Sequence, residues 1–217
     1  YHLLNFEKMG VVIESHGQEV HGHTQHAKAR NLLLEYPSVG ATENLMMFAV
    51  LTEGTTKIIN AALEPEVFDL IDALKKMGAQ ITVDVPATIT ITGVKELKAI
   101  DHTIMFDRME AAALLVAGAI TGGYVHLPQA PAHSMGMLLM KFQEMGHTIL
   151  IHPSGTGVKI KATRNPCAIS IKTAPYPGFP TDMQAYMMAA LTLSQGTSTV
   201  QETVFENRLM HAKELSK

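Results

Sequence analysis

The apolar and polar positions of the chain follow a pattern that recurs at a fixed interval. Helix-like segments end at Gly10, Gly78 and Gly146, each preceded by Met, and these glycines are 68 residues apart (78 − 10 and 146 − 78). Glycine most readily adopts the left-handed conformation that closes a helix. The runs that follow predict strands at residues 11–13, 81–83 and 148–151. A helix followed by a strand is therefore expected three times.

A second recurring feature is a glycine turn in front of a strand-like run, at residues 53–58, 122–125 and 195–200. The helix expected before the third turn has an apolar face made of Met183, Tyr186, Met187, Ala190 and Leu191. Each repeat reads as helix, strand, helix and then two or more strands. This order predicts an α/β (α+β) fold in which several units share a core. We expect one domain at residues 1–105 and another at residues 106–217.

Composition narrows the functional classes. The chain is 47% hydrophobic and 17% charged, which is typical of a folded protein. Its formal net charge of -3 provides no basic field for nucleic acid or an anionic membrane. The longest apolar stretches, such as residues 109–120, are too short to cross a bilayer. The single cysteine, Cys167, excludes an internal disulfide and favours a reducing cytoplasm.

Residues 36–44 contain the first helix start that could have a chemical function. Ser38 is a candidate N-cap, and an apolar helix is expected at about residues 45–51. The amides of Val39 and Gly40 would point outward, where a glycine admits a phosphate and the helix dipole favours negative charge. Ordinary helix capping explains the same pattern, so both interpretations stay open.

A second helix start is expected at Asp107. It precedes Glu110 by three residues, a spacing close to that of a capping box. Between them, Arg108 is either a surface residue or a residue at the domain junction that faces an anionic ligand.

The third helix start follows a loop with three prolines and one glycine, residues 175–180. Such a loop is stiff and would deliver Asp182 to a helix N-terminus. Asp182 can be a capping residue, or a general base that the rigid loop aims and the helix dipole keeps ionised.

Three other signals favour structural explanations. His16, His21, His23 and His26 lie among Gly and Gln without Cys or Asp at ligand spacing, which favours a solvated hairpin over a metal site. Residues 64–66 (Glu-Pro-Glu) are expected to start a helix with Pro65 in its first turn. Cys167 has no His or basic partner nearby in sequence and is interpreted as a small packing residue.

Six motifs in this order and spacing resemble the UDP-N-acetylglucosamine enolpyruvyl transferases of bacterial peptidoglycan synthesis. They are Pro37–Asn44, Glu53–Thr56, Glu64–Glu66, Asp107–Glu110, Pro177–Gln184 and Glu202–His211. The resemblance implies two similar domains, each of three βαβαββ units arranged as an inside-out α/β barrel, with substrates in the cleft between them. Residues 1–105 would be the later part of the first domain, which forms the UDP-sugar platform. Residues 106–217 would be the early part of the second.

The implied reaction transfers the enolpyruvyl group of phosphoenolpyruvate to the 3-hydroxyl of UDP-N-acetylglucosamine and releases phosphate. No metal or organic cofactor is required, and the partners are these two small molecules. Nucleic acid and membrane are not expected as partners, and the oligomeric state is left open. The protein would act in the cytoplasm.

The resemblance also implies roles for individual residues. Asp182 matches the proposed general base. The matched substrate-binding residues are Tyr1, His2, Tyr36, Pro37, Ser38, Val39, Gly40, Arg108, Val204 and Arg208. Tyr1 and His2 match a uridine-contacting loop and residues 36–40 the segment that holds uridine and diphosphate.

The match also has departures. Leu63, Ala112 and Ala113 differ from the residues usual in the family. The chain begins without Met inside an expected helix and stops where a fourth Met-Gly would be due. The family's Lys-Asn pair, Cys-bearing loop and C-terminal arginines are not matched, so we expect this 217-residue chain to be a middle portion, inactive by itself. The alternatives are the shikimate-pathway enolpyruvyl transferase and a non-catalytic sugar-nucleotide-binding remnant.

Overall fold

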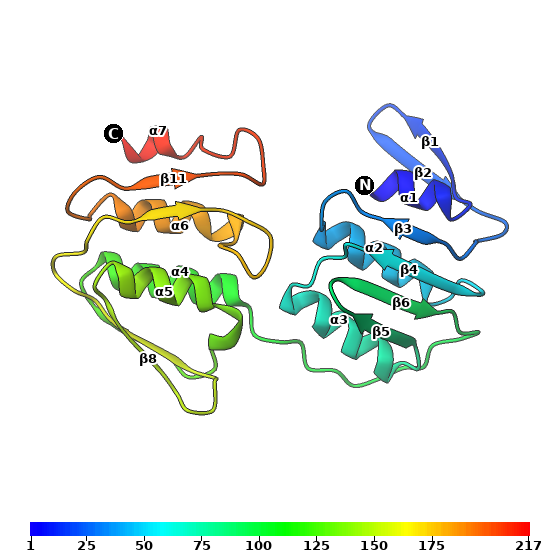
Figure 1. Ribbon diagram of the computed structural model, residues 1–217, viewed down its shortest axis with the longest axis horizontal. Coiled ribbons are helices and arrows are strands. Elements are labelled where there is room, and N and C mark those ends of the chain that lie inside the picture. Colours follow the sequence, from blue (N-terminus) through cyan, green and yellow to red (C-terminus); the bar gives the residue numbers. More distant parts are fainter. The chain divides into compact units, whose positions relative to one another are not determined.

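A computed structural model describes all 217 residues, Tyr1–Lys217 (Figure 1). The chain divides into two compact units, Tyr1–Met105 and Phe106–Lys217. The repeat pattern predicts a domain boundary near residue 105. Each unit has its own buried apolar cluster and is described by itself.

The first unit opens with one helix and a hairpin, followed by a complete βαβαββ motif. Its elements are α1 (His2–Lys8), β1 (Val12–His16), β2 (Glu19–His23), β3 (Asn31–Leu33), α2 (Val39–Ala49), β4 (Thr55–Ile59), α3 (Pro65–Lys76), β5 (Gln80–Asp84) and β6 (Thr88–Thr92). The main sheet has the order β3-β4-β6-β5, in which β3 and β4 are parallel and the other pairs antiparallel. Helix α2 is thus the crossover between two parallel strands.

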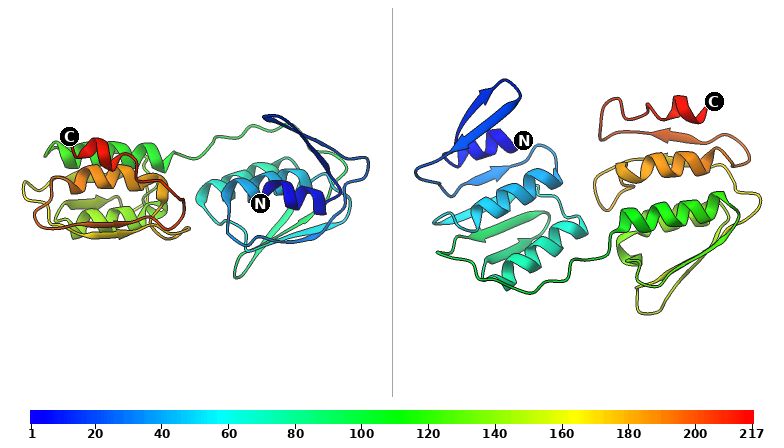
Figure 2. Two further views of the ribbon diagram at one scale, coloured as in Figure 1. Left: turned by 90° about the horizontal axis from the view of Figure 1, so that it is seen from above. Right: turned by 180° about the vertical axis from the view of Figure 1, so that it is seen from behind.

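The core of the first unit lies between this sheet and its helices. Leu32, Ile58 and Ile89 alternate with more exposed neighbours along their strands, so one face of the sheet is buried. Helix α2 contributes Leu45 and Met46 to the same cluster. The helices form a layer beside the strands (Figure 2).

The second unit begins with the same order of elements but without the first strand of the motif. Its elements are α4 (Arg108–Ile120), β7 (Tyr124–Leu127), the 3-10 helix η1 (Ala132–Ser134), α5 (Gly136–Glu144), β8 (Thr148–Ile151), β9 (Val158–Lys161), β10 (Ser170–Lys172), α6 (Thr181–Leu191), β11 (Thr199–Gln201) and α7 (Ala212–Leu215). The first sheet has the antiparallel order β7-β9-β8. Strands β10 and β11 then form a separate parallel pair, with α6 as their crossover.

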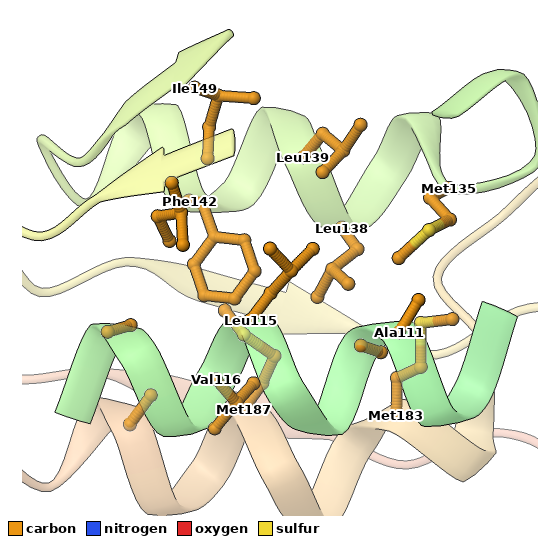
Figure 3. Packing of buried hydrophobic residues seen from close by; sticks show 14 of the residues in the cluster. Ala111, Leu115, Val116, Met135, Leu138, Leu139, Phe142, Ile149, Met183 and Met187 are labelled. Atoms are coloured by element: carbon orange, nitrogen blue, oxygen red, sulfur yellow. The ribbon is translucent and has the colours of Figure 1, made fainter. Parts of the chain in front are cut away.

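Helices α4, α5 and α6 meet in the core of the second unit. Figure 3 shows Phe142 of α5 pointing toward Leu115 of α4, with Met183 and Met187 of α6 below them. Phe142, Leu115 and both methionines are completely buried. The apolar face predicted for α6 is confirmed, except that Tyr186 is 39% exposed.

The recurring glycines have the conformation that the pattern predicts. Gly10, Gly78 and Gly146 have φ angles of 89°, 104° and 91°, and strands β1, β5 and β8 follow them. The glycine turns before β4, β7 and β11 also hold a residue with positive φ. The α/β fold is confirmed. None of the helices combines the length and apolar character that a membrane span requires.

Two smaller predictions need correction. The helix expected at residues 45–51 is α2, which begins six residues earlier, directly after Ser38, and ends at Ala49. Cys167 is exposed, so its interpretation as a packing residue is wrong. Its backbone is held by a bridge to Gln195 and a hydrogen bond to Met145 O, which leaves the side chain at the surface.

Two further structural predictions are confirmed. His16, His21 and His23 lie in the β1–β2 hairpin, where His16 and His21 are exposed and lie beside Glu14 and Glu19, and His26 follows the hairpin. Pro65 occupies the first turn of α3.

Candidate active site

Two of the three helix starts singled out for chemistry, at Ser38 and at Asp182, follow the first strand of a parallel pair. The loop from β3 to α2 contains Ser38, and the loop from β10 to α6 leads to Asp182. In α/β structures the carboxyl ends of parallel strands and the helix N-termini beside them are the usual place for ligands. The two candidate segments therefore occupy equivalent positions in two repeats.

Ser38 caps α2 as predicted. Its Oγ accepts a hydrogen bond from the Ala41 amide at 3.4 Å, while its own amide donates to Tyr36 O at 2.8 Å. The amides of Val39 and Gly40 open the helix and so have no partner within it. The start of α2 thus presents backbone donors beside Tyr36 and Pro37.

The N-terminal helix brings His2 to this segment. His2 Nδ1 lies 2.9 Å from Asn44 Nδ2, and a Cβ on Gly40 would lie 3.2 Å from His2 Cε1. The absence of a side chain at Gly40 therefore leaves space for the imidazole of His2. Tyr1, 53% exposed, occupies the N-cap position of the same helix, and its carbonyl oxygen accepts a hydrogen bond from Asn5 Nδ2 at 2.8 Å. The structure thus places His2 beside residues 36–40. In the sequence, only the family resemblance links these two segments.

The loop before α6 is closed by its own hydrogen bonds. Gly178 N donates to Pro175 O at 2.8 Å, and Ala174 N donates to Phe179 O at 3.0 Å. A Cβ on Gly178 would lie 2.6 Å from the Cβ of Ala174, so a larger residue does not fit this turn. Phe179 is 1% exposed and anchors the loop in the core. This geometry agrees with the stiff loop expected from its prolines.

Asp182 is not the capping residue of α6. Pro180 occupies the N-cap position and Asp182 is the second residue of the helix, so its side chain is left for other contacts. Its Oδ1 accepts a hydrogen bond from Arg208 Nη2 at 2.6 Å. The Asp182 side chain remains 58% exposed. It is neither buried nor turned into the core, and Oδ2 makes no hydrogen bond within the chain.

Arg208 reaches Asp182 from a loop 26 residues further along. Its Nη1 also donates to Thr181 Oγ1 at 3.0 Å, and its guanidinium lies 5.1 Å from the centre of the Phe205 ring. Val204, in the same loop, is half-buried and its amide donates to Glu202 at 2.8 Å. The second unit thus gathers Asp182, Arg208 and Val204 around the start of α6.

Glu202 is a central residue of this region that the sequence analysis did not single out. Its carboxylate accepts hydrogen bonds from the amides of Val204 and Phe205 and from the hydroxyls of Thr173 and Thr181. Burial by itself would raise the pKa of Glu202, but these four hydrogen bonds outweigh burial and hold the pKa below its ordinary value. The sequence signal was an acidic residue directly after a strand. Such a residue can accept hydrogen bonds from the amides of the residues two and three positions later.

Arg108 is buried in the second unit and is 3% exposed. Its guanidinium lies 5.3 Å from the centre of the Tyr176 ring, and Nη1 donates to Ser134 O at 3.4 Å. Asp107 caps α4 by accepting from the amides of Met109 and Glu110. Arg108 also lines a cavity of about 80 Å³ together with Tyr176. Its contacts within this unit therefore connect it to the loop before Asp182.

Comparison with known proteins identifies the family. The model of the family EPSP synthase (3-phosphoshikimate 1-carboxyvinyltransferase) matches residues 1–217. UDP-N-acetylglucosamine 1-carboxyvinyltransferase 1 of Caldanaerobacter subterraneus subsp. tengcongensis is 45% identical over 216 residues, 100% of this chain and 52% of that protein. The corresponding protein 1 of Staphylococcus aureus is 42% identical over 217 residues, 100% of this chain and 51% of the relative. The chain thus spans about half the length of the curated relatives it matches.

Solved structures show the same fold. The enolpyruvyl transferase NikO from Streptomyces tendae matches with a TM-score of 0.87 at 21% identity, covering 99% of this chain and 54% of that chain. EPSP synthase from Acinetobacter baumannii matches with a TM-score of 0.71 at 17% identity, covering 96% of this chain and 50% of that chain. Since the family model matches every residue, the chain belongs to the enolpyruvyl transferase family that is named after EPSP synthase (3-phosphoshikimate 1-carboxyvinyltransferase).

Proposed function

We propose that this chain provides the sugar-nucleotide platform and the general base of an enzyme that transfers an enolpyruvyl group from phosphoenolpyruvate to the 3-hydroxyl of UDP-N-acetylglucosamine. Relatives at 42% to 45% identity carry the name UDP-N-acetylglucosamine 1-carboxyvinyltransferase and support this substrate. The single observation behind the chemistry is the exposed Asp182 carboxylate at the start of α6, paired through one oxygen only. This reaction belongs to peptidoglycan synthesis, and the cytoplasm is its proposed location.

Asp182 takes the proton in the proposed mechanism. The 3-hydroxyl oxygen forms a bond to C2 of phosphoenolpyruvate while C3 gains a proton, which gives a tetrahedral ketal. Loss of a proton from C3 then restores the double bond as the C2–O bond to phosphate breaks. A general base must be ionised and within hydrogen-bond reach of the hydroxyl. The exposed Oδ2 of Asp182 meets the second condition for a ligand that approaches α6.

Arg208 has two functions in this proposal. Its ion pair occupies Asp182 Oδ1 and fixes the carboxylate, and its position beside Val204 suits contact with an anionic ligand. Val204 provides an apolar contact for the sugar nucleotide. Arg108 contributes through the loop that it supports at Tyr176.

The first unit is proposed to bind the nucleotide. The amides at Val39 and Gly40 are donors suited to diphosphate oxygens, because they open a helix and lack partners within it. Tyr36, Pro37 and Ser38 would hold the uridine side of the ligand, with Tyr1 and His2 beside them.

The shikimate-pathway reaction is the second candidate. The family description favours it, whereas the Acinetobacter baumannii structure, at 17% identity, supports only the shared fold. A non-catalytic sugar-nucleotide-binding remnant is the third.

Ligand titration separates the three candidates. Isothermal titration of the 217-residue chain with UDP-N-acetylglucosamine, and separately with shikimate 3-phosphate, should show heat only for the sugar nucleotide. Binding of shikimate 3-phosphate alone would overturn the proposed substrate. Turnover is then measured in the longest natural polypeptide that contains this sequence. Binding of the sugar nucleotide without phosphate release there would favour the non-catalytic remnant.

A further inference from the structure

Glu202 lies at the centre of a hydrogen-bond network that connects β10, α6 and the loop after β11. Its Oε1 accepts from Thr173 Oγ1 at 2.9 Å and from the amides of Val204 and Phe205 at 2.8 Å and 3.1 Å. Its Oε2 accepts from Thr181 Oγ1 at 2.8 Å. Glu202 therefore has one group of donors on Oε1 and a single hydroxyl on Oε2.

The charge of Glu202 decides the direction of the hydrogen bonds around Thr181. An ionised carboxylate can only accept, and a hydroxyl has only one proton to donate. The Thr181 hydroxyl therefore gives its proton to Glu202 and offers a lone pair to any second partner. That partner has to be a donor, and it is Arg208 Nη1, 3.0 Å away. The pKa of Glu202, held below its ordinary value by its donors, keeps the carboxylate charged at neutral pH.

The orientation of Arg208 follows from these contacts. A guanidinium is planar, so contacts to both of its terminal nitrogens fix the plane. Thr181 holds Nη1, Asp182 holds Nη2 at 2.6 Å, and the Phe205 ring lies beside the guanidinium. Without Thr181 as an acceptor, only the exposed contact to Asp182 and the ring would remain.

We propose that Glu202 is a positioning residue, which uses the Thr181 hydroxyl to hold Arg208 against Asp182 and so leaves Asp182 Oδ2 for the substrate hydroxyl. Glu202 makes no hydrogen bond to Asp182 itself and acts through Thr181 and Arg208. The substrate in this statement rests on the function proposed above, whereas the orientation of Arg208 does not.

Glu202→Gln distinguishes the role of the donors on Oε1 from the role of the single hydroxyl on Oε2. Three donors meet at Oε1, so the amide oxygen of Gln is expected there and its NH₂ group at the position of Oε2. The NH₂ group would donate to Thr181 Oγ1 instead of accepting from it, so the charge-assisted hydrogen bond that orients the Thr181 hydroxyl for Arg208 is lost. Thr181→Val removes the acceptor of Arg208 Nη1 itself. Thr173→Val is the matched control, because the Thr173 hydroxyl that it removes also donates to Glu202 but makes no hydrogen bond with Arg208.

The experiment measures rotation of the Arg208 guanidinium about its Nε–Cζ bond by ¹⁵N NMR in the ligand-free 217-residue chain. Loss of the hydrogen bond from Arg208 Nη1 should accelerate this rotation roughly tenfold in Thr181→Val, and loss of the fixed Thr181 orientation should accelerate it in Glu202→Gln. The double variant should rotate no faster than Thr181→Val alone, because Glu202 acts on Arg208 through Thr181. Thr181→Ser and Thr173→Val should stay close to the wild-type rate.

Unchanged Arg208 rotation in Glu202→Gln and Thr181→Val would overturn the proposal, as would an equal acceleration in Thr173→Val. If Glu202→Gln does not fold, Thr181→Val and Thr181→Ser decide the question by themselves. Titration of the wild type with UDP-N-acetylglucosamine tests the proposed function separately. Slow Arg208 rotation without UDP-N-acetylglucosamine binding would remove the proposed substrate and retain the positioning role.

Discussion

Arg208 and Asp182 form an ion pair of 2.6 Å between a loop and the first turn of α6, and both side chains remain partly exposed. An exposed ion pair contributes little to stability because water screens both charges. The pair is therefore better explained by what it does to Asp182 than by what it adds to the fold. It occupies one carboxylate oxygen, and the other makes no hydrogen bond within the chain.

Asp182→Asn should separate stability from activity. We expect the free energy of unfolding to change by less than about 1 kcal/mol, because the pair is exposed. In a polypeptide that contains this chain and turns over substrate, kcat should fall by about 10² to 10⁴, the range for loss of a general base. Chemical denaturation and phosphate release measure the two quantities. The exposed Asp101→Asn is the control, and an active Asp182→Asn protein would exclude Asp182 as the base.

Glu202 predicts an acid-dependent loss of stability. Its pKa is lower in the folded chain than its ordinary value of 4.5, so its contribution is present above pH 4.5 and is lost as the pH falls through the folded pKa. The difference in unfolding free energy between wild type and Glu202→Gln should be about 1–3 kcal/mol near neutral pH and shrink below pH 4.5. Denaturant titrations at several pH values measure it. A difference that stays constant down to pH 2 would contradict this assignment.

His147 predicts a second pH dependence, in a higher range. Burial lowers its pKa below the ordinary value of 6.5, and its Nδ1 accepts from Thr163 N at 3.1 Å, which requires the neutral ring. The unfolded chain takes up this proton first, so stability should fall as the pH drops below 6.5 toward the folded pKa. His147→Gln should remove this slope. The exposed His126→Gln serves as control and should keep it.

Gly118→Ala should destabilise the second unit although it lies within a helix. The change normally favours a helix by up to about 1 kcal/mol. Here the new Cβ would lie 2.5 Å from Val125 Cγ2, so overpacking should cost about 1–3 kcal/mol instead. Adding Val125→Ala should recover part of the loss. Gly136→Ala, with no atom within 4 Å of its Cβ position, is the control in thermal unfolding.

The 217-residue chain by itself should release no phosphate from phosphoenolpyruvate in the presence of UDP-N-acetylglucosamine. It spans 51% to 52% of the relatives' length, and a reaction between two bound substrates requires all of the groups that position them. A phosphate assay at high protein concentration measures this. Turnover at rates typical of enzymes would show that these residues are sufficient.

The repeat, the strands after each glycine and the caps at Ser38 and Asp107 were predictable from the amino-acid order. Each depends on residues within one turn of helix or a few positions of a strand, where backbone conformation and local hydrogen bonds dominate. The place of Asp182 was predictable only approximately. Pro180 takes the cap position in the folded chain and leaves the carboxylate two residues inside the helix start.

The contacts between distant residues were not predictable in this way. Glu202 meets Thr181 across 21 positions and Thr173 across 29, and Arg208 meets Asp182 across 26. No local pattern encodes these hydrogen bonds, because they form only when the parallel pairing of β10 and β11 brings the two loops to the same edge. The exposure of Cys167 and the burial of Arg108 likewise depend on which surfaces the folded elements cover, and this is settled by packing rather than by neighbours along the chain.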